Sequence, residues 1–225
     1  MNKKFVLGLT SFLMFLISGP MANAYSYAGF RYLSYPYQQS PPGFGVSASI
    51  YTINPSVSGL NHIAQYVTVI VSASPLYWVQ TGYAKGVGTS YILKSYTELC
   101  DQNHPQGSTQ KIYYTSPTAG TTYSWLLYRD TPSSTVWKAS SSLWGSTTHT
   151  IGQPVPSYTQ LNYQSESEVL QSGISMANSH FYSLSYHNSQ TDWTLWPDPY
   201  PQQIDQTSPY WCTKIHSYEF TAGGP

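Results

Sequence analysis

The sequence predicts an all-β fold, a sandwich or jelly roll of two antiparallel sheets. Many short runs alternate apolar and polar residues, at intervals of about eight to twelve residues. Pro and Gly separate these runs, and no window keeps a helical period of 3.6 residues beyond a turn or two. Such strands bury their apolar faces by pairing two sheets around one core.

The first residues have the order of a secretory signal peptide. Lys3 and Lys4 precede an apolar run over 5–17, and the small residues Ala22 and Ala24 form a cleavage site. The run is too short for a stable membrane span. We therefore expect a secreted, extracellular protein with three parts: a signal peptide over 1–24, a Tyr/Pro-rich arm over 25–45, and one β-sandwich domain over 46–225.

Charge is scarce, since only 8% of the residues are Asp, Glu, Lys or Arg, against roughly 25% in an average protein. The near-neutral balance and the lack of a basic patch argue against nucleic acid as a partner. Few carboxylates are present to be protonated, which predicts tolerance of acid. The six histidines are scattered without zinc-ligand spacing, so we expect no metal and no cofactor.

Cys100 and Cys212 are the only two cysteines. In an oxidising compartment, an even pair predicts one disulfide. It would close a loop of roughly a hundred residues and stabilise the fold by about 4–5 kcal/mol on the chain-entropy model.

The predicted strands begin after the arm. Residues 46–50 alternate as a half-buried strand, and 65–71 are apolar on both faces, as in a central strand. The run 77–83 follows a Ser-Pro turn, so it is expected to form a hairpin with 65–71. Further strands are predicted over 91–99, 111–115, 123–129, 135–139, 158–169, 181–186, 193–196 and 210–220.

Two of these strands carry polar side chains suited to catalysis. Alternation places Gln80 on one face with Trp78 and Gly82, and it places Gln164, Glu166 and Glu168 together on another. The first face offers an uncharged hydrogen-bond donor and the second offers carboxylates that can transfer protons. If both strands belong to one curved sheet, the two faces could meet.

The order of these segments is similar to that in a known family. Val46-Ser47-Ala48-Ser49-Ile50, then Asn54-Pro55-Ser56-Val57, then Trp78-Val79-Gln80-Thr81-Gly82-Tyr83 resemble an "SA…P.V" strand followed by a "LQTG-aromatic" strand. The glutamate strand and the run from Ser179 to Leu184, with the later Trp193 and Trp196, complete the match. The chain thus resembles the glutamic peptidases of the eqolisin type and their neprosin-like and bacterial relatives, although the eqolisin pattern "AEFIIE" is not reproduced.

The resemblance implies a concanavalin A-like sandwich of two seven-stranded sheets and an acid-acting Gln/Glu dyad that hydrolyses polypeptides. By position, Gln80 matches the family's glutamine. Glu166 matches the Glu-Ser/Thr pattern of bacterial relatives, and Glu168 matches the Glu-Val pattern of neprosin-like ones. We expect Trp78, Tyr66, Tyr83 and Gln164 to line the substrate groove. The mature protein is expected to be a monomer without membrane attachment.

Other interpretations of the same residues stay open. Gln80 could be an ordinary hydrogen-bonded residue on a half-exposed strand, and Glu166 with Glu168 a solvated strand face. The excess of Trp and Tyr also suits a lectin-like carbohydrate-binding sandwich without catalytic activity. A pair of carboxylates on one sheet also suits a glycoside hydrolase, since retaining glycosidases place two about 5–5.5 Å apart.

Overall fold

The computed structural model describes ten segments of the chain, and all structural statements below concern these residues. They are 28–31, 45–59, 61–73, 75–106, 108–131, 134–151, 160–162, 174–187, 193–196 and 203–225. Fifteen strands and one short 3-10 helix (η1, Val87–Thr89) lie in these segments. The described residues thus confirm the predicted all-β fold.

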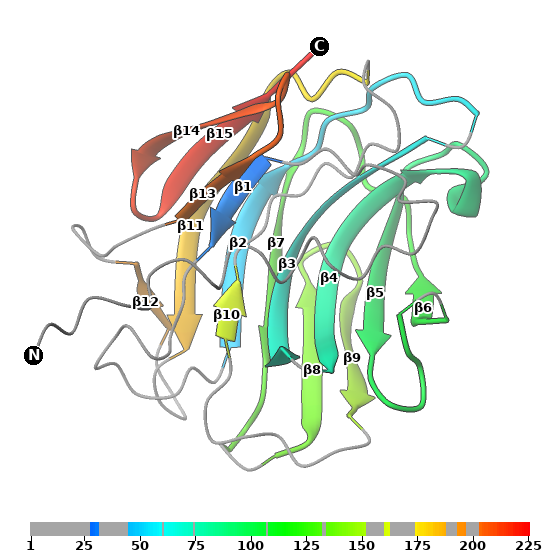
Figure 1. Ribbon diagram of the computed structural model, residues 1–225, viewed down its shortest axis with the longest axis vertical. Helices are drawn as coiled ribbons and strands as arrows, with labels where there is room; N and C mark the ends of the chain where they lie inside the picture. Colours follow the sequence, from blue (N-terminus) through cyan, green and yellow to red (C-terminus); the bar gives the residue numbers. More distant parts are fainter. Residues whose placement is uncertain are drawn as a thin grey trace, which may run out of the picture.

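One layer of the fold is a five-stranded antiparallel sheet, seen at the front of Figure 1. Its strand order is β10-β3-β4-β5-β6. β3 and β4 form the hairpin that the sequence predicts, and their register continues over most of both strands. The bounds are β3 (His62–Ala73), β4 (Leu76–Gly86), β5 (Lys94–Cys100), β6 (Gln110–Tyr113) and β10 (Gln160–Asn162).

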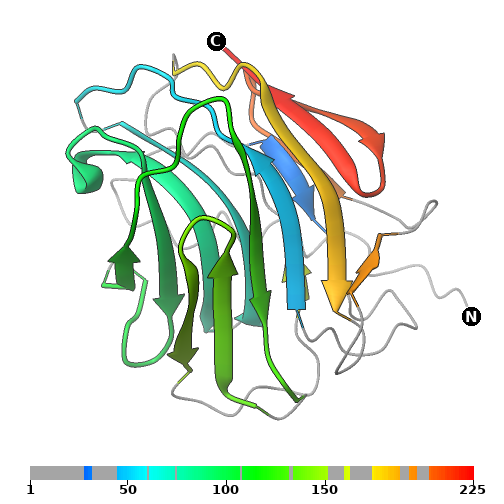
Figure 2. The same cartoon turned by 180° about the vertical axis from the view of Figure 1, so that it is seen from behind.

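The second layer is a larger antiparallel sheet, which faces the viewer in Figure 2. Its order is β14-β15-β11-β2-β7-β8-β9, and β12 pairs with β11. Its strands are β2 (Gly45–Tyr51), β7 (Thr122–Tyr128), β8 (Val136–Ser141), β9 (Gly145–Thr150), β11 (Ser179–His187), β12 (Trp193–Leu195), β14 (Trp211–His216) and β15 (Glu219–Gly223). The segment 210–220, predicted as one closing strand, instead turns back as the β14–β15 hairpin.

A third, two-stranded pair joins β1 (Ala28–Arg31) to β13 (Gln203–Gln206). The described strands are therefore divided among sheets of five, eight and two strands, where the resemblance implied two sheets of seven. An additional strand can pair only at the free edge of a sheet. It therefore changes the number of strands in a sheet but not the two-layer arrangement.

The core lies between the two large sheets and follows directly from alternation. Val67, Val69 and Val79 point inward from the five-stranded sheet, and Trp125 with Leu127 points inward from the other. All five side chains have no solvent exposure. Burying a side chain of this kind stabilises the fold by about 1.5–3 kcal/mol, so a one-residue slip in either sheet would be costly.

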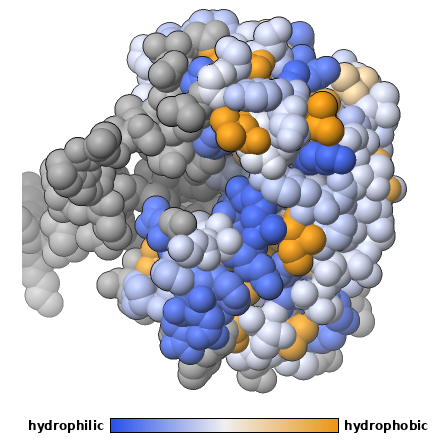
Figure 3. Space-filling model, turned by 90° about the vertical axis from the view of Figure 1, so that its right-hand side faces the viewer, coloured by the Kyte–Doolittle hydropathy of each residue, from blue (hydrophilic) through white to orange (hydrophobic). Residues whose placement is uncertain are grey.

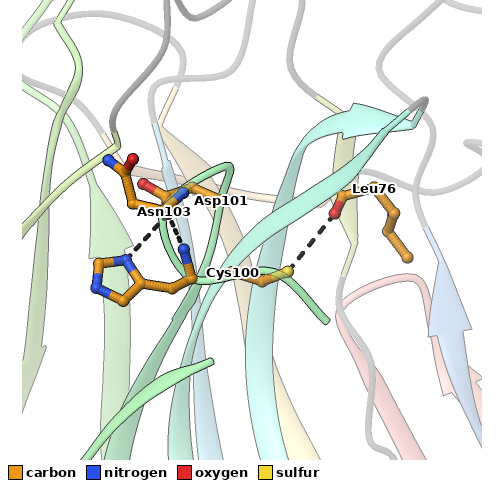
Figure 4. Close-up of polar contacts among 5 residues, drawn as sticks. Leu76, Cys100, Asp101 and Asn103 are labelled. Carbon is orange, nitrogen blue, oxygen red and sulfur yellow. Dashed lines mark hydrogen bonds and ion pairs between the residues drawn. The ribbon is translucent and has the colours of Figure 1, made fainter. Parts of the chain in front are cut away.

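The predicted disulfide between Cys100 and Cys212 is wrong, because both cysteines are buried as free thiols. Cys100 ends β5, and Cys212 lies in β14 at the opposite side of the fold (Figure 1). A disulfide needs Cα atoms within about 7 Å, and strands at opposite sides of the fold do not meet this condition. Instead, the Cys100 thiol donates a long hydrogen bond of 3.6 Å to the carbonyl oxygen of Leu76 (Figure 4).

The loop after Cys100 is organised by one buried carboxylate. Asp101 is 1% exposed, and its Oδ1 accepts bonds from the backbone N–H groups of Asn103 and His104 at 2.9 and 2.8 Å (Figure 4). His104 Nδ1 lies 3.0 Å from the same oxygen. These contacts fix the turn through which the chain leaves β5. No helix among the described residues is long and apolar enough to cross a membrane.

Candidate functional site

Gln80 lies on β4, the middle strand of the five-stranded sheet, and its side chain is half-buried. Val79 and Thr81 on either side are buried inward. Alternation therefore turns Gln80 to the outer face of this sheet, together with Trp78 and Gly82. The shared face of Trp78, Gln80 and Gly82 is as the sequence predicts.

The Gln80 amide makes two hydrogen bonds to the neighbouring strand. Its Nε2 lies 2.7 Å from Glu98 Oε2 and 3.1 Å from the Tyr96 hydroxyl. The strand register explains both contacts, because Glu98 stands directly opposite Gln80 and Tyr96 stands opposite Gly82. An amide NH₂ group has two N–H bonds, so both are engaged. A substrate oxygen would have to share the weaker of these bonds, the one to Tyr96.

Glu98 is a nearly buried carboxylate, 7% exposed, with three donors around it. Besides Gln80, Thr109 Oγ1 donates to its Oε1 at 2.5 Å, and Lys111 Nζ lies 2.9 Å from its Oε2. The Lys111 ammonium also lies 4.9 Å from the centroid of the Tyr96 ring. These contacts hold the Gln80 amide with its nitrogen toward Glu98, since the carbonyl oxygen there would face a carboxylate.

Gly82, next to Thr81 in the Gln-Thr-Gly motif, permits close approach of β3. A Cβ atom at this position would come within 2.0 Å of the Gln65 carbonyl oxygen and 2.6 Å of the Tyr66 Cα. No other residue type fits without moving backbone. The motif glycine thus keeps the strand beside Gln80 in register.

The described residues among those expected to line the substrate groove lie on two different faces of the sheet. Trp78 and Tyr66 share the outer face with Gln80; Trp78 is half-buried, whereas Tyr66 is only 3% exposed and packs with Ala64, Ala84 and Tyr96. Tyr83 lies on the inner face instead, fully buried, and its hydroxyl contacts the Ile53 N–H and Gln65 Oε1. Tyr83 follows Gln80 by an odd number of residues, so the alternation of side chains along a strand turns it to the opposite face, into the core.

Gln164, Glu166 and Glu168 lie outside the described residues. The strand that precedes them in sequence is described. β10 pairs with β3 so that Asn162 stands opposite Thr68, and Thr68 in turn stands opposite Gln80. Asn162 and Gln80 therefore lie level with each other in the sheet, and β3 is the single strand between them.

The sequence interpretation missed Glu98. The signal was present, since Tyr96 and Glu98 alternate with Thr97 in a predicted strand. Only the register of β5 against β4 shows that Glu98 meets Gln80. Among the described residues, no three His, Cys, Asp or Glu side chains gather where they could hold a metal ion. The surface at the β5–β6 side of the sandwich is mostly hydrophilic, with isolated hydrophobic residues (Figure 3).

Comparison with solved structures links this architecture to peptidases. One crystal structure of scytalido-glutamic peptidase, with a peptide-based transition-state analogue, aligns with a TM-score of 0.54 at 10% identity. A second, with a transition-state analogue inhibitor, gives 0.53 at 11%. Both alignments cover 89% of this chain and 98% of the peptidase chain. SCP-B, a member of the eqolisin family in complex with the tripeptide Ala-Ile-His, aligns at 0.49 and 11%, with the same coverage.

Searches of sequences gave no such link: no protein-family model matches the chain, and no curated protein matches it. The likeness is therefore one of three-dimensional structure. It confirms the resemblance seen in the sequence at the level of the fold: the chain has the β-sandwich fold of the glutamic peptidases.

Proposed function

We propose that this protein is a secreted glutamic endopeptidase that hydrolyses polypeptides in acid. One observation carries the proposal: in a chain with the glutamic peptidase fold, Gln80 stands on the outer face of the middle strand, its amide held by Glu98. Gln80 is the residue that the resemblance assigns to the family's glutamine. Its neutral amide keeps its hydrogen-bonding capacity at any pH, whereas a histidine-based triad would be protonated in acid.

In this proposal the catalytic carboxylate is Glu166 or Glu168. Both glutamates lie an even number of residues after Asn162, so in the strand that the sequence predicts over 158–169 they share the face of Asn162. The described part of that strand, β10, pairs with β3. A glutamate with a reference pKa near 4.3 can accept a proton from water as the water attacks the peptide carbonyl. The same group then returns the proton to the leaving amine, which completes hydrolysis.

Gln80 has the role of hydrogen-bond donor to the oxyanion that develops on the carbonyl oxygen. The bond to the Tyr96 hydroxyl, at 3.1 Å, is the longer of its two contacts. That N–H is the one assigned to the substrate. The shorter bond to Glu98 keeps the nitrogen in place, so that little reorganisation is needed during the reaction.

Glu98 itself is a poorer choice for the general base. Its two oxygens already accept bonds from Gln80, Thr109 and Lys111. It shares the outer face with Gln80 but is only 7% exposed. We therefore assign Glu98 to positioning of the amide, and we leave proton transfer to Glu166 or Glu168.

Hydrolysis of denatured casein between pH 2 and pH 6 tests the proposal. Gln80→Ala is expected to lower kcat by about 10²–10³, the usual effect of removing an oxyanion donor. One of Glu166→Gln and Glu168→Gln should abolish activity, and the other should retain most of it. Equal hydrolysis by the wild type and all three variants would reject the assignment, as would a wild type without activity at any pH in this range.

A further inference from the structure

A hollow of about 410 Å³ opens on the other side of the sandwich, away from Gln80. It lies on the outer face of the eight-stranded sheet, over β2, β7, β11 and β15, which are neighbours in the view of Figure 2. Three tyrosines line it, namely Tyr51, Tyr182 and Tyr218. The proposed peptidase reaction uses none of these residues.

One polar pair lies in the wall of this hollow. His180 Nε2 is 2.8 Å from Glu219 Oε1, and the two side chains are 36% and 24% exposed. The His180 ring packs beside the Tyr182 ring, with centroids 5.1 Å apart. Tyr218, which also lines the hollow, stacks on His216, with ring centroids 5.0 Å apart and an interplanar angle of 17°. The hollow therefore combines aromatic surfaces with a carboxylate and an imidazole that solvent can reach.

The backbone at the hollow is strained. The register of β11 against β2 shifts between Tyr182 and Ser185, which marks a bulge. Within it Ser183 has φ 54°, a left-handed conformation that disfavours a side chain. Ser183 itself lines the hollow. Strain of this kind costs about 1–3 kcal/mol and is concentrated at functional sites.

Several hydrogen bonds hold this bulge in place. The Leu184 N–H donates to the Tyr218 carbonyl at 3.0 Å, and Ser185 Oγ donates to the Ser183 carbonyl at 2.9 Å. The Trp196 N–H donates to the Leu184 carbonyl at 3.1 Å. Bulges re-aim side chains next to binding sites, and here the fixed bulge sets Tyr182 and Ser183 at the wall.

We propose that this hollow binds a hexose unit of a neutral polysaccharide. Tyrosine rings offer broad apolar faces that fit the C–H faces of a sugar, and their hydroxyls add hydrogen bonds. Glu219 and His180 can accept from and donate to sugar hydroxyls. A phosphate or an acidic sugar would meet the Glu219 carboxylate and be repelled. The volume is within the range of small-molecule sites.

Binding to insoluble neutral polysaccharides tests the inference. Purified protein would be incubated with cellulose, a β-1,3-glucan and mannan, and the free fraction measured. We expect retention on at least one of them, with affinity reduced at least tenfold by Tyr182→Ala and by Tyr218→Ala. Tyr113→Ala, which removes an exposed tyrosine from the other sheet, serves as the matched control and should bind as the wild type does.

A nearly isosteric variant covers the case in which a tyrosine variant fails to fold. Glu219→Gln removes the charge but keeps the shape, and it should also weaken retention. Failure of the wild type to bind any of the three polysaccharides would overturn the inference. Undiminished binding by Glu219→Gln and by the folded tyrosine variants would overturn it equally. Gln80→Ala should bind as the wild type does, so this result is independent of the peptidase proposal.

Discussion

Gln80 and Glu98 face each other across β4 and β5, with Nε2 and Oε2 2.7 Å apart. The contact joins an uncharged amide to a carboxylate that is 7% exposed and that Lys111 also contacts. A hydrogen bond to a charged, poorly solvated partner is stronger than one between neutral groups. Glu98 is thereby the main restraint on the orientation of the Gln80 amide.

We expect Glu98→Gln to lower kcat on casein by roughly tenfold to a hundredfold, since hydrogen bonds to charged groups contribute about 1.5–3 kcal/mol. The variant keeps the side-chain shape but loses the charge that orients Gln80. Glu219→Gln, on the other sheet, is the matched control and should retain full activity.

A double mutant separates positioning from a catalytic role of its own. If Glu98 acts through Gln80, Glu98→Gln should have little further effect in a Gln80→Ala background. A full additional loss in the double mutant would contradict the positioning role. Circular dichroism and thermal unfolding of each variant check that the fold is intact.

The fold could be predicted from the sequence because alternation is a local property. The runs at 46–50, 65–71 and 77–83 lie in β2, β3 and β4. Two of them alternate apolar and polar residues, and 65–71 is apolar on both faces, as expected of a strand with neighbours on both sides. The disulfide could not be judged from sequence, because a cysteine count carries no information on which strands lie far apart in the fold. Glu98 was missed for a related reason: its distance from Gln80 depends on register, which the loop with η1 sets.

The cysteines provide a prediction on chemical reactivity. Burial, the main cause, raises the pKa of the Cys100 thiol to about 12, and the nearby Glu98 and Asp101 add to the effect. At pH 8 this cysteine should be almost entirely protonated, and a thiol is a poor nucleophile. The native protein should thus leave Cys100 unmodified by iodoacetamide, as peptide mass spectrometry would show, whereas protein unfolded in urea should react.

The absence of the disulfide is tested separately by reduction. Because both thiols are free in the structure, dithiothreitol should leave the midpoint of thermal unfolding unchanged. A drop of several degrees would mean that a disulfide stabilises the protein, which would contradict the placement of the two cysteines.

His149 makes stability depend on pH. It is 2% exposed, its Nε2 lies 2.7 Å from Thr97 Oγ1, and burial lowers its pKa below the ordinary value of 6.5. Below pH 6.5 the unfolded chain therefore binds a proton that the folded protein does not. This group makes the free energy of unfolding fall as the pH drops through 6.5, until the lower folded pKa is reached.

Urea unfolding at pH 7.5 and pH 5 measures this effect. The wild type should lose stability between the two values, and His149→Asn should lose less, since its side chain does not titrate. His62→Asn is a control at a more exposed histidine and should follow the wild type. An equal loss in His149→Asn and the wild type would exclude His149 as the cause.

Arg129 is a buried cation next to the core. Its side chain has no solvent exposure, and its three guanidinium nitrogens have no hydrogen-bond partner among the described residues. It lies over the Trp137 ring, 5.2 Å from the centroid, and burial lowers its pKa to about 10. A cation–π contact of this kind contributes only about 2 kcal/mol, less than the several kcal/mol that it costs to desolvate an ion.

Replacing this charge with an apolar side chain of similar length should therefore leave the fold as stable or make it more stable. We expect Arg129→Met to change the free energy of unfolding by about zero to 4 kcal/mol in the stabilising direction, measured by urea unfolding at pH 7. Lys138→Met, which breaks the exposed ion pair with Asp130, is the control and should leave the free energy of unfolding almost unchanged, because solvent screens such a pair. A destabilisation of about 3–5 kcal/mol by Arg129→Met would show instead that the guanidinium is held by an anionic partner, because breaking a buried ion pair has that cost.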